Sequence, residues 1–451
     1  KNLQSIVSVL VDNIVKELDI ETSDAFTRIE YNSEAYDLYL KSKSVYSLSD
    51  NYDDNLEAVE LMKQAISKDK NLVMAQIYLG QMQYDLGYFA EASIIYEKAL
   101  SRSKSLQDNA GVAESLRKQG QLLRKNKEYE AALAKFGEAL SISTVMNDKS
   151  SMAKTFNSIA ILNYKTDDKD NALKNWLHAL AIVEEFGDKP KISKYLNNIG
   201  IWYWQDYDYS KSIEYYQKSL LIKRELGDVR NIAKTLNNLG EVYFAMGDYT
   251  NSTKQFDESI EIKEKLKDDK GLNTALYNRG ETYFYSFEYN RAIDDFRRTI
   301  KMIDDEESDH ERYRYIGMSH FYLSNFDSCN FYLKKSDEFF ANDYRKRLAI
   351  LPYLVISYMK TGDNTLSNTA LKNFRDIISD YDPPDKDYII TNWAAYKALS
   401  AVNEKSEAAE YLENAYFMLK SKSKDIKNKQ DRKKYLSAKL HENIMNEWSK
   451  R

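Results

Sequence analysis

The stretch Ala-Lys-Thr-Leu-Asn-Asn-Leu-Gly-Glu-Val-Tyr-Phe-Ala-Met-Gly-Asp-Tyr-Thr-Asn-Ser-Thr-Lys-Gln-Phe-Asp-Glu-Ser-Ile, residues 233–260, decides the fold of this chain. Its first half spaces apolar and small residues along one face of a helix. Gly247-Asp248 then predicts a turn, after which Ser252 and Phe256 begin a second helical face. The stretch therefore predicts a helical hairpin. A single hairpin cannot bury its own apolar face, so it becomes stable only when further copies stack against it.

Further copies occur at intervals of 40 residues. A small residue in the first helix marks each copy, another small residue follows 12 positions later, and an aromatic residue follows 4 positions after that. The first of these positions holds Gly80, Gly120, Ala160, Gly200, Gly240 and Gly280. Because the three positions keep one register through six copies, the sequence predicts a continuous array of stacked hairpins.

The pattern resembles the tetratricopeptide repeat, whose usual period is about 34 residues. The longer form here, with Leu-Asn-Asn-Ile-Gly at 196–200 and Leu-Asn-Asn-Leu-Gly at 236–240, is similar to the long repeats of kinesin light chains and cell-polarity adaptors. This resemblance implies an all-α, right-handed superhelical solenoid whose concave face is lined by the first helices of the hairpins. It also implies a scaffold that binds a protein or a peptide segment on that face.

Three parts are expected along the chain. Residues 1–33 form an N-terminal helix and connector, which we interpret as the end of a truncated upstream domain. Residues 34–420 form an array of about ten hairpins, and residues 421–451 form a C-terminal capping helix. Within the array the repeats are regular over 73–306 and irregular over 34–71 and 307–420.

A second resemblance concerns the N-terminal region. Residues 3–20, 32–41 and 58–71 resemble a bacterial junction at which a TolB-like domain precedes tetratricopeptide repeats, often downstream of a class III adenylate or guanylate cyclase or a DNA-binding regulator. This resemblance implies an alternative function, in which the chain is the sensor or regulatory segment of a signalling protein. Its output domain would then lie upstream of Lys1, and the array would contact that domain intramolecularly.

Composition excludes several classes of partner. The net charge is −5 with both signs interspersed, so the sequence shows no phosphate-binding face and we expect no nucleic acid partner. The most apolar run, 348–359, is too short to span a bilayer, so we expect no membrane span and a cytoplasmic location. Cys329 is the only cysteine, which excludes an internal disulfide; we expect it to pack as a small hydrophobic residue.

The sequence offers no support for catalysis. Its four histidines lie far apart, and none has a carboxylate or cysteine at metal-ligand spacing. It also contains no glycine-rich phosphate loop and no nucleophile elbow. We therefore expect neither an enzyme nor a bound cofactor or metal.

Asparagines of the first helices are the main candidates for a binding site. They stand two or three positions before the small residue, and a side-chain amide can donate to and accept from one peptide unit of a partner. They are Asn157, Asn197, Asn198, Asn237, Asn238 and Asn278. The alternative is that these amides face solvent or bridge adjacent helices.

An aromatic stripe is the second candidate. It occupies the position four after the small residue and comprises Tyr164, Trp204, Phe244 and Phe284. Such a stripe either stacks against apolar side chains of a partner or packs between neighbouring repeats, and we favour packing.

Overall fold

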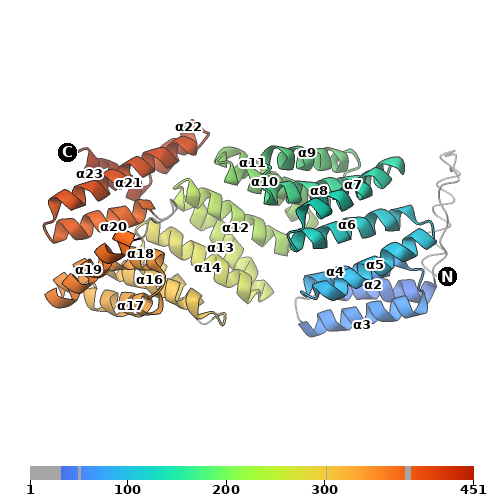
Figure 1. Cartoon of the computed structure of the whole chain (residues 1–451), viewed down its shortest axis with the longest axis horizontal. Helices are drawn as coiled ribbons and strands as arrows, with labels where there is room; N and C mark the ends of the chain where they lie inside the picture. Colours follow the sequence, from blue (N-terminus) through green and yellow to red (C-terminus); the bar gives the residue numbers. More distant parts are fainter. Residues whose placement is uncertain (1–31, 49–51, 301, 381–387) are drawn as a thin grey trace. The chain divides into compact units, whose positions relative to one another are not determined.

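The computed structural model describes residues 32–48, 52–300, 302–380 and 388–451, and all regular secondary structure within them is α-helical (Figure 1). The predicted all-α solenoid of helical hairpins is confirmed. The expected N-terminal helix lies outside the described residues. The chain divides into two compact units, one ending at Tyr195 and one beginning at Leu196.

The unit that ends at Tyr195 consists of hairpins joined by short turns. They are α2 (Ser33–Leu48) with α3 (Tyr52–Lys68), α4 (Val73–Asp85) with α5 (Phe89–Ser105), α6 (Asn109–Lys125) with α7 (Tyr129–Val145), and α8 (Lys149–Lys165) with α9 (Lys169–Glu185). The unit also contains the start of α10 (Lys189–Gln205), whose remainder belongs to the second unit.

The unit that begins at Leu196 continues the same arrangement. Its helices are the rest of α10 with α11 (Tyr209–Leu226), α12 (Val229–Ala245) with α13 (Tyr249–Leu266), α14 (Asp269–Tyr285) with α15 (Tyr289–Thr299), α16 (Glu306–Tyr322) with α17 (Phe326–Phe339), α18 (Tyr344–Lys360) with α19 (Asn364–Asp380), α20 (Tyr388–Ala401) with α21 (Lys405–Asp425), and finally α22 (Lys429–Leu436) and α23 (Lys439–Trp448).

Aspartates at the helix starts explain the short turns. Each accepts a hydrogen bond from the backbone N–H three residues later, which satisfies a donor that the helix itself leaves free. The aspartates that do so include Asp108, Asp148, Asp168, Asp208, Asp228, Asp248 and Asp268. In the hairpin of residues 233–260, Gly247 precedes this cap with φ of 75°, a conformation that glycine adopts without strain.

The sequence register corresponds to a close packing contact inside each hairpin. The small residue of the first helix lies against the aromatic ring of the second, and the ring is buried. A Cβ atom added to Gly120 would lie 2.6 Å from Phe136 Cε1, and one added to Gly240 would lie 2.6 Å from Phe256 Cε1. Phe136 and Phe256 are both 0% exposed. The contact therefore fixes the distance between the two helices. Cys329 is also fully buried, as expected.

We predict that Gly120→Ala destabilises the protein by ~1–3 kcal/mol, because the added methyl group overlaps the Phe136 ring in a packed core. Gly137→Ala is the matched control. Gly137 lies in α7 with no atom within 4 Å of the added Cβ, so alanine should stabilise the helix by ~0.5–1 kcal/mol. Chemical denaturation of the two variants measures both effects. Equal stability of the two would contradict the packing account.

The chain after residue 420 differs from the single capping helix that we expected. Helix α21 continues to Asp425, and α22 and α23 follow as two shorter helices. Leu440 and Ile444 of α23 pack against Leu412 and Leu419 of α21, so this end of the array is covered.

The segment 426–438, which we call the C-terminal strap, returns to repeats about 200 residues earlier in the same unit. Lys427 donates its backbone N–H to Tyr207 O at 3.2 Å, and Ile426 joins the core around Leu236. Asp431 is 4% exposed, and its Oδ2 accepts from the Ser210 N–H at 2.9 Å and the Ser210 hydroxyl at 2.7 Å. The strap is therefore held by specific polar contacts as well as by burial.

We predict that Asp431→Ala loosens the strap, because it leaves the backbone N–H of Ser210 without its acceptor, at a cost of ~1–3 kcal/mol. Hydrogen exchange should accelerate in the strap while that of α14 to α17 stays unchanged. Lys429→Ala, at an exposed position of α22, serves as the control. If Asp431→Ala exchanges like the parent, the strap does not depend on this contact.

Candidate partner-binding surface

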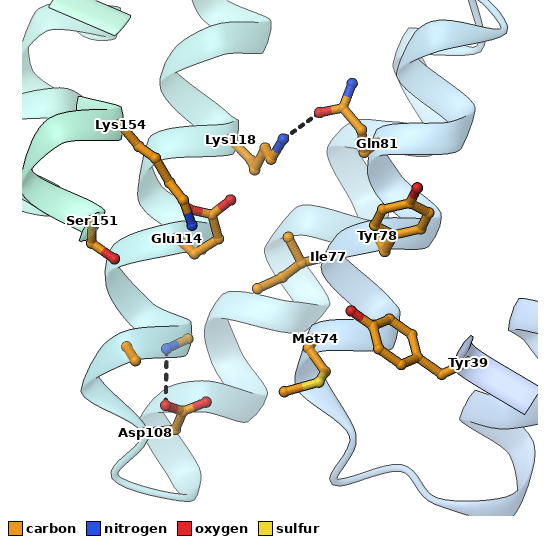
Figure 2. Close-up of a pocket in the computed structure, with 12 residues that line it drawn as sticks. Tyr39, Met74, Ile77, Tyr78, Gln81, Asp108, Glu114, Lys118, Ser151 and Lys154 are labelled. Carbon is orange, nitrogen blue, oxygen red and sulfur yellow. Dashed lines mark hydrogen bonds between the residues drawn. The ribbon is translucent and has the colours of Figure 1, made fainter. Parts of the chain in front are cut away.

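The first helices of the unit that ends at Tyr195 enclose a hollow of about 530 Å³ (Figure 2). We call it the first-unit hollow. Helices α2, α4, α6 and α8 supply its lining, which includes Tyr39, Met74, Tyr78, Lys118 and Lys154. Its volume lies within the ~300–1,000 Å³ that is typical of ligand sites.

One end of the first-unit hollow is apolar and aromatic. The rings of Tyr39 and Tyr78 meet edge to face with centroids 6.2 Å apart, and Lys43 Nζ lies 5.2 Å from the Tyr39 centroid. Burial raises the pKa of Tyr39 to about 12, so its hydroxyl stays protonated at neutral pH. Met74 is 38% exposed beside these rings. This end therefore offers open apolar surface within a hollow.

The opposite end is charged, and its main carboxylate is already paired. The Arg117 guanidinium donates to both oxygens of Glu114 and also to Ser158 Oγ at 3.4 Å. Burial alone would raise the pKa of Glu114, but the charge and hydrogen bonds of Arg117, together with the charges of Lys118 and Lys154, outweigh burial and lower the pKa to about 2. Glu114 is thus ionised at all ordinary pH values and its charge is compensated.

Two lysines that line this end, Lys118 and Lys154, act on Glu114 by charge without forming a direct ion pair among the described residues. Burial and the Arg117 charge lower the pKa of Lys118 to about 8, and its ammonium donates to the neutral Gln81 side chain. Lys194 of α10 is exposed and does not line the hollow. Among the described residues, neither the Lys154 ammonium nor the Lys194 ammonium makes a hydrogen bond or ion pair. This end of the hollow therefore holds one paired carboxylate and two further ammonium groups, those of Lys118 and Lys154.

The asparagines three positions before the small residue lie inside the hairpins. Asn157 is 6% exposed, and its Oδ1 accepts from Trp176 Nε1 at 3.1 Å. Asn197 Oδ1 accepts from Lys223 Nζ at 3.4 Å, and Asn237 donates to Glu241 Oε1 at 2.8 Å. These side chains already make hydrogen bonds within the array. Contact between them and a partner stays a prediction.

The asparagines two positions before the small residue are turned by a further ~100° around the helix. Asn278 donates to Glu241 Oε1 at 3.1 Å, so it bridges α14 to α12. Asn238 is partly exposed and makes no side-chain hydrogen bond with a described residue, whereas Asn198 has a partner. Asn238 is accordingly the amide of this set that is open to a partner.

The aromatic stripe makes contacts within the array. Tyr164 lies 5.7 Å from the Trp176 ring, and Phe244 lies 5.4 Å from the Tyr285 ring, measured between centroids. Phe284 is 5% exposed, and Trp204 packs at the edge of the core around Leu236. A role of this stripe in binding stays a prediction.

A second hollow of about 300 Å³ lies in the other unit, along α14, α16, α18 and α20. Arg314 pairs with Glu311 at 2.8 Å, and Lys346 pairs with the same carboxylate at 2.8 Å. Glu281 instead accepts from the Tyr315 hydroxyl. Burial raises the pKa of Glu281 to about 7.

We predict that Glu281→Gln stabilises the protein more at about pH 8 than at about pH 5. The folded carboxyl binds a proton more tightly than the unfolded one, so stability falls as pH rises from the unfolded pKa to the folded value near 7. The groups that act on it, Glu241, Glu311, Arg314 and Tyr315, are unchanged in the variant. Thermal melts of both proteins at the two pH values measure the difference. A constant difference would mean that Glu281 titrates normally.

The lysines were not among the residues that sequence reasoning selected. Lys154, Lys194 and Lys234 stand six positions before the small residue in three successive copies, so the 40-residue register contained the signal. Lys118 lies elsewhere in the register, two positions before Gly120. Its contact with Gln81 of α4 becomes visible only when the helices are packed.

Metal sites and membrane-spanning helices are two further features of interest. Among the described residues there is no group of three or more histidine, cysteine, aspartate or glutamate side chains placed to hold a metal ion. Nor is any helix in the described part of the chain both long and apolar enough to cross a membrane.

The arrangement of hairpins defines a helical-repeat protein with hollows along its first helices, and family comparison identifies the repeat. The tetratricopeptide-repeat family matches residues 151–225 and 231–305. These residues are tetratricopeptide repeats, in register with the 40-residue pattern. A comparison with curated proteins finds no match.

Solved structures share the fold at low sequence identity. A signal-transduction ATPase with numerous domains and a tetratricopeptide repeat sensor, from Pyrococcus horikoshii, is 15% identical with a TM-score of 0.57. That match covers 76% of this chain and 56% of the ATPase. The apo form of RapI is 17% identical with a TM-score of 0.51, covering 76% of this chain and 97% of RapI. Both likenesses concern the fold alone.

Proposed function

We propose that the chain is a non-catalytic scaffold that binds a peptide segment of a partner protein on its first helices. The observation that carries this proposal is the first-unit hollow, where open apolar surface lies beside the half-buried ammonium groups of Lys118 and Lys154. Buried or half-buried charge without a partner costs stability, so its presence in a hollow favours a binding role.

The repeat itself supports the same proposal. Stacked hairpins give an extended surface on which successive first helices present equivalent positions, as Asn198, Asn238 and Asn278 do. A peptide in extended conformation can contact several of these positions at once. The proposal therefore also assigns partner contacts to the asparagines and the aromatic stripe, within each unit taken by itself.

A second candidate is the regulatory segment of a signalling protein. It is favoured by the similarity in fold to an ATPase whose repeats are described as a sensor. In that case the array would bind its partner and transmit the event to an output domain upstream of Lys1. The two candidates share the binding step, and only the second couples binding to an output domain.

We predict that random peptides displayed on phage are enriched by the intact chain and bind less tightly to the Asn198→Ala, Asn238→Ala, Asn278→Ala variant. Loss of one amide contact that a peptide unit uses should weaken binding by ~1 kcal/mol, about fivefold. Fluorescence anisotropy of the enriched peptides gives the affinities.

The control replaces amides of second helices, Gln217→Ala and Gln255→Ala, which lie on α11 and α13. Affinity should be unchanged in this control. If the enriched peptides bind the asparagine variant and the glutamine control equally, the asparagines do not contact the peptide. Failure of any peptide to be enriched would contradict the scaffold proposal.

A further inference from the structure

We infer that the C-terminal strap is a releasable clasp that sets the width of the second hollow, the one along α14, α16, α18 and α20. This goes beyond the proposed function, because it concerns the shape of the second unit whichever partner binds there. The strap follows the hairpin turns in their repeat register, and the second hollow lies between helices that are not neighbours in the array.

The strap crosses three hairpin turns in the order in which the repeats stack. These turns lie 40 residues apart, and the residues with positive φ in them are Tyr207, Gly247 and Phe287. The residues that meet the turns follow in the same order along the chain and are Lys427, Lys434, Ala438 and, directly after the strap, Lys439. The strap therefore joins the last hairpin to three earlier hairpins of the same unit.

Glycine at the second of these turns lets the strap approach closely. A Cβ atom added to Gly247 would lie 2.8 Å from Ala438 Cβ, and the Lys434 carbonyl oxygen would be 3.4 Å away. Gly87 holds the same register position in the unit that ends at Tyr195, and a Cβ atom there would meet nothing within 4 Å. Both glycines provide a positive φ, but only Gly247 also makes room for a neighbouring segment.

The second hollow spans helices that are separated in the array. Tyr277 and Glu281 of α14 line it together with Ile390 of α20, although two hairpins stand between these helices. Each repeat of a solenoid contacts mainly its neighbours, so small rotations between successive hairpins add up along the array. The distance between α14 and α20 therefore varies unless a further contact holds the last hairpin in place.

The strap supplies such a contact. It begins where α21 ends and leads into α23, which packs back onto α21. Between these points it bonds to the turns of α10–α11 and α12–α13, and α13 packs directly against α14. The last hairpin is thus held relative to α14 from two sides, through the stacked hairpins and through the strap. With the strap detached, the stacked hairpins carry this spacing almost alone.

The strap can detach without unfolding the helices around it. Its ion pairs with the turns, Lys427 with Asp206 and Lys434 with Asp248, have lysine side chains that are 53% and 51% exposed, and such pairs contribute little net stability. In α22, Asp431 alone is buried. A segment with few buried apolar contacts opens at a lower free energy than the core does. Both of its ends remain attached to one hairpin, so opening frees no chain terminus.

A clasp of this kind regulates what the second hollow can bind. A partner that fits the closed hollow better than the open one holds the strap closed, and it shifts the equilibrium only by the difference between its two affinities. A partner that prefers the open hollow releases the strap by the same rule. Closure of the strap and occupancy of the second hollow are then linked.

The experiment measures the distance between spin labels on α14 and α21 by double electron–electron resonance, in the intact chain without a partner. The labels are attached at Thr274→Cys and Glu413→Cys, which are exposed positions. Cys329 is fully buried and should not react with the label. We expect one narrow distance distribution in the labelled parent, because the strap holds the last hairpin.

Gly247→Ala should broaden this distribution and displace it, because the added methyl group keeps Ala438 away from the turn. Gly87→Ala is the matched control, since it strains a turn of the same kind with no neighbour near the methyl group. Asp431→Ala removes a different strap contact and should act like Gly247→Ala. Circular dichroism checks folding, and if Gly247→Ala does not fold, the comparison of Asp431→Ala with the parent decides.

A compensating substitution separates loss of the strap from strain in the turn. Ala438→Gly removes the atom nearest to the added methyl group and leaves the Lys434 carbonyl oxygen at 3.4 Å. Gly247→Ala combined with Ala438→Gly should therefore recover the narrow distribution, although the turn is still strained. Labels at Lys254→Cys and Asp294→Cys, on α13 and α15, report adjacent hairpins and should give the same distance in every variant.

Three outcomes would overturn the inference. A broad distribution in the parent would mean that the strap does not hold the last hairpin. A parent-like distribution in both Gly247→Ala and Asp431→Ala would mean that stacking and the packing of Tyr285 against the last hairpin fix the spacing. Failure of Ala438→Gly to restore the distribution would assign the effect to the turn. Because no partner is added, these results are independent of whether the scaffold proposal succeeds or fails.

Discussion

The contact between a small residue and a buried aromatic ring is the constraint on which the array depends. Gly120 against Phe136 and Gly240 against Phe256 leave no room for a further methyl group, so the two helices of each hairpin approach at a fixed distance. Where Ala160 stands in place of glycine, the ring is Trp176, and its Nε1 bonds to Asn157. The hairpin thus tolerates alanine with tryptophan in place of glycine with phenylalanine, and here a hydrogen bond to the ring accompanies the exchange. Regular hairpins then place equivalent positions of successive first helices along one surface.

Much of the fold could be predicted from this register, because a contact that recurs in every hairpin requires the same residue types at a fixed interval in the sequence. The residues that face a partner were harder to predict. One residue changes the direction of a helical side chain by ~100°, so Asn237 and Asn238 differ in exposure although both fit the pattern. The return of the C-terminal strap to Ser210 could not be predicted either. A contact between residues 221 positions apart has no periodic signal, and it depends on how the intervening repeats stack.

Charge is arranged differently in the two units when each is considered separately. In the first unit, burial and the nearby Arg117 charge lower the pKa values of Lys118 and Lys194. In the second, Glu241 and Glu281 are half-buried carboxylates whose hydrogen bonds come from neutral amides and a tyrosine hydroxyl. Neither arrangement maximises stability, since hydrophobic or paired groups would do so more simply. Packing of small residues against aromatic rings, together with the helix caps, stabilises the fold enough to tolerate these charged groups.

Photo-cross-linking tests the central claim most directly. A peptide enriched by phage display and carrying a photoreactive apolar residue would be irradiated with the intact chain, and the modified residues would be mapped by mass spectrometry. The account predicts cross-links to Met74, Ile77 or Tyr78 at the apolar end of the first-unit hollow, which Lys118 and Lys154 also line. Cross-links confined to the second helices α5, α7 and α9 would contradict it.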